Sequence, residues 1–84
     1  MTYEVHFSDL AAKQFRKLER DLQERIRSTL KRIWTRPEAY ISKLVHDNGY
    51  KLRVGDYRLI LEVDQKDQRI YVIKIGHRKN IYDF

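Results

Sequence analysis

The chain has 84 residues, no cysteine, and 18 Lys and Arg against 12 Asp and Glu, which gives a formal net charge of +6. This length suits one small domain over residues 1–84 with a shallow functional site. The lack of cysteine excludes disulfides and thiolate metal sites, and no apolar run approaches the roughly 20 residues that span a bilayer. We therefore expect a cytoplasmic protein without a membrane partner, and the positive charge favours a polyanion such as nucleic acid.

The first half of the chain predicts a short strand and two helices. Residues 3–7 alternate between apolar and polar side chains, which is typical of a strand, and Ser8 offers its hydroxyl as a helix N-cap. Apolar residues then recur at helical spacing up to Leu18, and again from Asp21 until Arg36-Pro37 ends the pattern. Because few residues connect the two helices, we expect an antiparallel pair.

The second half predicts a loop followed by three strands. Residues 37–49 have loop composition, with room for one helical turn. The strands Tyr50–Val54 and Tyr57–Val63 are separated by Gly55-Asp56, which suits a type II′ hairpin, and the last strand is Arg69–Ile75. The order β-α-α-β-β-β predicts an α+β domain, in which a small, mostly antiparallel sheet carries two helices on one face.

The hairpin makes a geometric prediction about charge. A two-residue loop places Arg53 opposite Arg58, and strand alternation puts Lys51 on the same side. Directly opposed like charges weaken an antiparallel pair by up to about 1 kcal/mol, whereas a bound anion would reverse that sign. The alternative is an ordinary solvated sheet face. The string "GHRKNIY" follows the last strand, and we expect it to bring His77 and Arg78 to an edge of the cationic face.

Basic residues also recur in the helical half, where residues 8–36 hold nine basic and four acidic side chains. Two basic side chains four residues apart in a helix repel each other mildly unless an anion is near. The expected pairs are Lys13 with Lys17, Arg16 with Arg20, and Arg27 with Lys31. Docking onto a nucleic-acid backbone is the functional interpretation, and a solvated face is the alternative. The residues concerned are Lys13, Arg16, Lys17, Arg20, Arg27 and Lys31. The histidines, His6, His46 and His77, are too scattered to predict a metal site.

Two strings in the second half resemble a known family. "YKLRVGDYRLILEV" and "YVIKIGHRKNIY", behind a short strand and two basic helices, resemble the RelE/ParE superfamily of prokaryotic toxins, and most closely its RelE branch. The resemblance covers nearly the whole chain and implies the same β-α-α-β-β-β fold. It further implies the toxin of a type II toxin-antitoxin system: a ribosome-dependent endoribonuclease that cleaves messenger RNA without a metal or other cofactor. The expected partners are a cognate antitoxin, the ribosome and mRNA, with no small-molecule ligand.

The resemblance also assigns candidate catalytic residues, which are Lys51, Arg53, Arg58, Arg78 and Tyr82. Metal-free cleavage by the ribose 2′-OH needs a base, positive charge on the phosphate and an acid. Arg58 and Arg78 are candidates for the phosphate clamp, and Tyr82 for stacking on a base or orienting the 2′-OH. Lys51 and His77 are both candidates for the general base. Two alternatives stay open: a ParE-like inhibitor of DNA gyrase, and a non-catalytic RNA-binding module.

Overall fold

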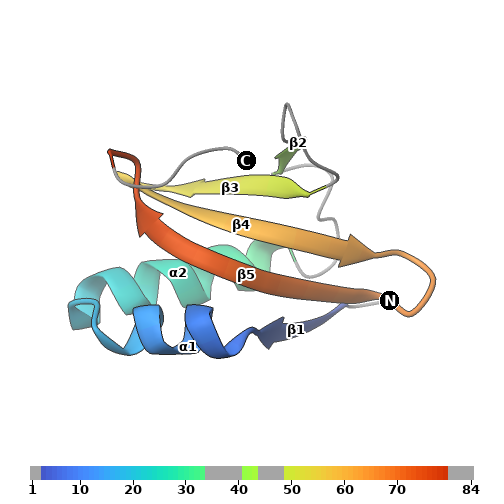
Figure 1. Cartoon of the computed structure of the whole chain (residues 1–84), viewed down its shortest axis with the longest axis horizontal. Coiled ribbons are helices and arrows are strands. Elements are labelled where there is room, and N and C mark those ends of the chain that lie inside the picture. The colour runs from blue at the N-terminus through green and yellow to red at the C-terminus, as the bar shows by residue number, and fades with distance from the viewer. Residues whose placement is uncertain (1–2, 34–40, 44–48, 80–84) are drawn as a thin grey trace.

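The computed structural model describes residues 3–33, 41–43 and 49–79 (Figure 1). The elements in chain order are β1 (Glu4–Phe7), α1 (Asp9–Arg16), α2 (Arg20–Ile33), β2 (Ser42–Lys43), β3 (Tyr50–Val54), β4 (Tyr57–Asp64) and β5 (Arg69–His77). The predicted order β-α-α-β-β-β is confirmed, with β2 as an addition. The predictions for His46, Tyr82 and the end of the second helix at Arg36-Pro37 lie outside the described residues. No helix among the described residues is long and apolar enough to cross a membrane.

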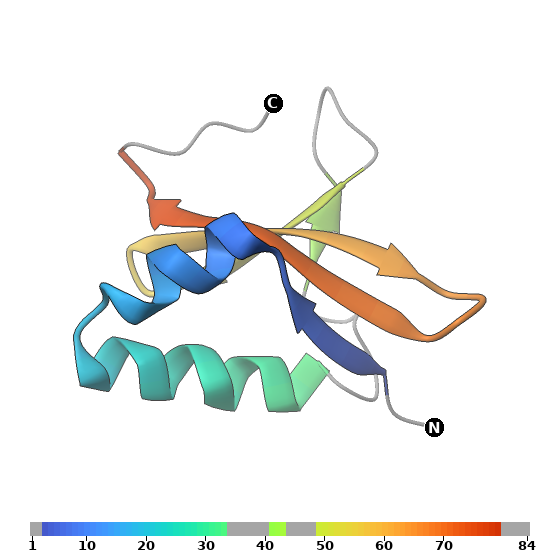
Figure 2. The same ribbon diagram turned by 60° about the horizontal axis from the view of Figure 1, so that its bottom comes forward.

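The five strands form one sheet in the order β1-β5-β4-β3-β2. β1 pairs with β5 in parallel, and every other neighbouring pair is antiparallel, so the sheet is mostly antiparallel as predicted. Both helices lie on one side of this sheet (Figure 2). We call that side the inner face and the opposite side the outer face.

Two predictions about strand limits were wrong. Ser42 and Lys43, expected in a loop, form β2 and pair with Lys51 and Tyr50. A strand of two residues is too short to show an alternating pattern in the sequence. Only its pairing with the edge of β3 defines it as a strand. β5 also continues to His77 instead of ending at Ile75, because Gly76 and His77 keep their partners Arg58 and Tyr57 on β4.

The β3–β4 hairpin has the geometry predicted for it. Gly55 has φ +59°, and Asp56 is not among the residues with positive φ, as a type II′ turn requires. The register places Arg53 opposite Arg58 and Lys51 opposite Ile60. Glycine also fits the available space, because a Cβ at position 55 would lie 3.1 Å from Nη1 of Arg25 on α2.

Polar side chains of the first helix tie it to β5. The Ser8 hydroxyl accepts the N–H of Ala11 at 3.0 Å, as predicted for an N-cap, and donates to the carbonyl of Ile73 at 2.7 Å. Oε1 of Gln14 accepts the N–H of Ile75 at 2.6 Å. The register between β4 and β5 shifts by one residue in this region, so α1 satisfies backbone groups of β5 beside the bulge.

The core lies between the inner face of the sheet and the helices. Its largest fully buried side chains come from α2, β4 and β5, and are Ile26, Ile33, Leu59, Leu61, Ile70 and Val72. Residues on β3 and β4 that alternate with the core positions necessarily project from the outer face. The packing of the inner face therefore decides which side chains are available on the outer one.

Candidate functional site

A cationic pocket opens on the outer face near the β3–β4 hairpin. Ser42, Lys51, Arg53 and Arg58 line a hollow of about 220 Å³, and we call these four residues the cationic pocket. Lys51 and Arg53 alternate along β3 with the buried Leu52. The predicted sharing of one face by Lys51, Arg53 and Arg58 is thus confirmed.

The pocket borders a buried apolar residue. Ile60 is only 3% exposed although its strand position directs it to the outer face, and it does not belong to the core cluster. Its neighbours across the sheet are Lys51 on β3 and Lys74 on β5. Because an apolar neighbour lowers the local dielectric, a phosphate bound here would interact more strongly with these cations than it would in open water.

Sequence analysis missed Ser42, the polar neutral member of the pocket. Its place is set by β2, which pairs Ser42 directly with Lys51. The hydroxyl can donate or accept a hydrogen bond, so it adds a directional hydrogen-bonding group to the three cations. No motif marked Ser42 in the sequence, because the strand that carries it spans only two residues.

His77 does not join the cationic pocket. It lies opposite Tyr57 in the β4–β5 register, and the two rings meet edge to face with centroids 5.3 Å apart. Tyr57 packs against the core, so His77 lies on the inner side of the sheet. The expectation that His77 would reach the cationic face was wrong, because β5 continues through Gly76 and its alternation puts His77 on the same side as the buried Ile75.

Arg78 lies in the turn directly after β5. Its backbone N–H donates to the carbonyl oxygen of Asp56 at 2.8 Å, and its side chain is exposed. Asp56 belongs to the hairpin loop between Arg53 and Arg58, so Arg78 lies at the same end of the sheet as these arginines. Tyr82 falls outside the described residues.

The other end of the outer face has a different charge pattern. Arg69 on β5 lies opposite Glu4 on β1 and Asp64 on β4. Its hydrogen bond with the Tyr71 side chain, followed by the charges of Tyr71, Glu4 and Asp67, raises the pKa of the Arg69 guanidinium. His6 Nε2 lies 2.7 Å from Oε1 of Glu4, and its ring stacks on Tyr71 with centroids 5.7 Å apart. Opposite charges and polar partners therefore alternate at this end.

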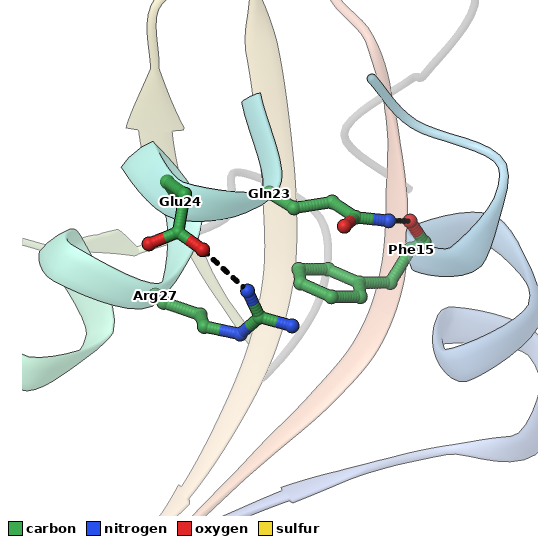
Figure 3. Close-up of polar contacts among 4 residues, drawn as sticks. All are labelled: Phe15, Gln23, Glu24 and Arg27. Atoms are coloured by element: carbon green, nitrogen blue, oxygen red, sulfur yellow. Dashed lines mark hydrogen bonds and ion pairs between the residues drawn. The ribbon is translucent and has the colours of Figure 1, made fainter. Parts of the chain in front are cut away.

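A second surface lies where the helices meet β1. Two adjoining hollows, of about 300 and 220 Å³, share Phe7, Arg27 and Leu30, and we call them the helical groove. Figure 3 shows how the helices are joined there: Gln23 Nε2 donates to the carbonyl of Phe15 at 2.8 Å, and the guanidinium of Arg27 lies 5.2 Å from the Phe15 ring centroid. Arg27 also pairs with Glu24 at 2.9 Å.

The six basic residues singled out in the helical half are all exposed, and three of them border the helical groove. Arg16, Arg27 and Lys31 border the helical groove. Arg16 and Arg20 are not a pair within one helix as expected, because α1 ends at Arg16 and α2 begins at Arg20. A tight last turn causes the break, since the N–H groups of Lys17 and Leu18 reach back only three residues. Lys13, Lys17 and Arg20 are exposed and do not line the helical groove.

The described side chains offer no metal site. Among residues 3–33, 41–43 and 49–79, no three His, Cys, Asp or Glu side chains are grouped so that they could hold a metal ion. The chemistry that the described residues support is electrostatic binding of an anion by Lys51, Arg53 and Arg58, with a hydroxyl beside them.

Comparisons with known proteins place the chain in a family. The family model "ParE toxin of type II toxin-antitoxin system, parDE" matches residues 5–82. A RelE-like toxin protein of Escherichia coli is 30% identical over 82 residues, which cover 94% of this chain and 86% of the relative. The match reaches across both helices and the whole sheet.

Solved structures agree with that assignment. The RelBE toxin-antitoxin complex of E. coli matches with 31% identity and a TM-score of 0.76 over 89% of this chain and 95% of that one. The RelBE2 complex of Mycobacterium tuberculosis shares the fold, with a TM-score of 0.84 over 93% and 100% of the two chains at 20% identity. The chain therefore belongs to the RelE/ParE family of toxins of type II toxin-antitoxin systems.

Proposed function

We propose that this toxin is an endoribonuclease that cleaves mRNA on the ribosome, without a metal cofactor, and so inhibits translation in the cytoplasm. The observation that carries the proposal is the cationic pocket, in which Arg53 and Arg58 oppose each other beside Lys51 and Ser42. An opposed arginine pair weakens the isolated sheet, and an RNA phosphate between the two side chains turns that repulsion into attraction. The volume of about 220 Å³ is also below the roughly 300–1,000 Å³ typical of small-molecule sites, so the pocket suits one phosphate of a polymer better than a small molecule.

The reaction proposed is transfer of the phosphate to the neighbouring 2′-oxygen. The 2′-oxygen forms a bond to phosphorus while the bond to the 5′-oxygen breaks, leaving a 2′,3′-cyclic phosphate and a 5′-hydroxyl. Lys51 takes the proton of the 2′-OH. The 5′-oxygen takes a proton from water as it leaves, and the hydroxide formed removes the proton held by Lys51. Arg58 binds the non-bridging oxygens through two N–H groups, and Arg53 adds positive charge as the phosphate gains negative charge.

Two further residues enter the proposal through the family resemblance. Arg78, whose backbone is fixed beside the hairpin loop, is the second phosphate clamp. Tyr82 stacks on a base or orients the 2′-OH. Phosphate contacts from exposed cations position a protein on RNA without reading its sequence, and this is the role proposed on the ribosome for Lys13, Arg16, Lys17, Arg20, Arg27 and Lys31.

The partner proposed is a RelB-type antitoxin, since the relatives from E. coli and M. tuberculosis form complexes with their own antitoxins. The helical groove combines apolar side chains with a basic rim of Arg16, Arg27 and Lys31. This combination fits an amphipathic segment that carries acidic residues along its edges. Charge reversal with R27E and K31E should weaken binding of the cognate antitoxin to the purified toxin. Unaltered antitoxin binding would place its docking surface elsewhere.

The proposal is tested by adding the purified toxin, freed of antitoxin, to ribosomes programmed with mRNA and mapping the mRNA ends by primer extension. Discrete cuts in the decoding site, absent on naked mRNA, are the expected result. The double variant R53A/R58A should not cut. R69A, which removes an arginine at the other end of the outer face, is the matched control and should cut normally. Intact mRNA with the unaltered toxin would contradict the proposal.

The second candidate is inhibition of DNA gyrase by binding, which the ParE description of the family model favours. A supercoiling assay with purified gyrase distinguishes the two functions. Loss of supercoiling together with intact mRNA would assign the cationic pocket to a binding surface. Binding to programmed ribosomes without cuts or loss of supercoiling would indicate the non-catalytic RNA-binding module instead.

A further inference from the structure

The turn after β5 is held in place from two sides. On one side, the backbone N–H of Arg78 donates to the carbonyl oxygen of Asp56 in the hairpin loop at 2.8 Å. On the other, the backbone N–H of Lys79 donates to Nδ1 of His77 at 3.2 Å. The imidazole is itself held by the edge-to-face contact with Tyr57, at 5.3 Å between ring centroids. Arg78 thus lies between two anchors, both of which depend on the β4 end of the hairpin.

The hydrogen bond from Lys79 specifies the form of the imidazole. Nδ1 accepts a hydrogen bond only when it carries no proton, so this bond requires the tautomer with its proton on Nε2. A general base must also come within hydrogen-bond reach of the proton that it removes. The ring of His77 lies with Tyr57 on the inner side, whereas Lys51 and Arg58 line the outer side. This arrangement disfavours His77 as the base.

We infer that His77 is a positioning residue, which acts through Nδ1 to order the turn that carries Arg78. An arginine on a pre-ordered turn loses less conformational freedom when it binds a phosphate than an arginine on a flexible segment does. His77 therefore contributes to cleavage through Arg78, without contact with RNA. The inference rests on the proposed function where it concerns cleavage, but the order of the turn itself can be measured independently.

Two substitutions separate a positioning role from a catalytic one. H77N places an amide oxygen near the position of Nδ1, whereas H77Q places its amide near the position of Nε2. We expect H77N to cleave within about threefold of the unaltered toxin, and H77Q to lose about threefold to tenfold, the size of one hydrogen bond. The pH profile of single-turnover cleavage on ribosomes should keep its shape in H77N. If H77N is as slow as H77Q and the acidic limb of the profile disappears, His77 is the base and the inference is wrong.

A measurement that needs no activity completes the test. In the full-length toxin, nitrogen-15 NMR should show the Nε2–H tautomer of His77, and the Lys79 amide should exchange slowly in the unaltered toxin and in H77N but faster in H77Q. A proton on Nδ1, or equal exchange in all three proteins, would overturn the inference whatever the ribosome assay shows. Intact mRNA with slow Lys79 exchange would instead reject only the proposed cleavage. Thermal melting of each variant verifies that it is folded.

Discussion

The two ends of the outer face are built on opposite electrostatic patterns. Near β1, Arg69 lies across from Glu4 and Asp64, so each neighbouring pair combines unlike charges. Near the hairpin, Arg53 lies across from Arg58. Unlike cross-strand pairs stabilise a sheet by roughly 0.2–1 kcal/mol and like pairs destabilise it. The two ends of the face therefore differ in whether their cross-strand charge pairs are unlike or like.

This contrast is confined to the outer face of the sheet. Both ends share the same sheet and the same inner core, and they differ in what lies on the outer side. The hairpin end combines a like-charge pair with Ser42, Lys51 and the buried Ile60. Cations gathered in one place attract anions, and this is the property on which the proposed binding of an RNA phosphate depends.

The largest effect is expected from removing a cation at the hairpin end. R58A should lower the single-turnover rate of mRNA cleavage on ribosomes by about 10²–10³-fold, the usual loss for one group that stabilises transition-state charge. R69A, the matched arginine at the β1 end, should leave the rate nearly unchanged. Equal losses in the two variants would mean that general positive charge, and not the pocket, supports cleavage.

The next effect concerns the turn that creates the like-charge pair. G55A should destabilise the toxin by more than about 1 kcal/mol, because alanine is strained at positive φ and its Cβ would approach Nη1 of Arg25 at 3.1 Å. G55N should lose less, since asparagine tolerates this backbone region better. Denaturant unfolding measures both. Amide exchange should rise at the hairpin while the β1–β5 pairing stays protected, and uniform loss of protection would contradict a local effect.

A smaller effect is expected from the neutral member of the pocket. S42A should slow cleavage by about twofold to tenfold, the size of one hydrogen bond, and should leave the melting temperature unchanged because Ser42 is exposed. S28A removes an exposed hydroxyl on α2 and serves as the control. A rate for S42A equal to that of S28A would show that the hydroxyl makes no contact with RNA.

The smallest effects test the charge pattern directly. R53E converts the like pair with Arg58 into an unlike pair and should stabilise the fold by up to about 1 kcal/mol while it lowers cleavage. R69E places a third carboxylate beside Glu4 and Asp64 and should destabilise the fold by a similar amount. Both changes in the free energy of unfolding should shrink in high salt. Changes of the same sign would contradict the comparison of the two ends.

Much of the cationic pocket could be predicted from the sequence because its geometry is local. Gly55-Asp56 is a two-residue loop, and such a loop determines which residues of the adjoining strands oppose each other. That was enough to place Arg53 opposite Arg58, with Lys51 on the same side. Short patterns of spacing also predicted the N-cap at Ser8, the two helices, and the order of the longer strands along the chain.

The remaining features depend on contacts between segments far apart in the chain. Ser42 enters the pocket through pairing with β3, and the bulge beside Ile60 shifts the register between β4 and β5. His77 faces the inner side because β5 stays paired beyond Gly76, and one residue more or less of strand reverses the side on which a side chain projects. Local spacing thus determined the cationic pair by itself, whereas long-range pairing decided which hydroxyl joined it and which histidine stayed away.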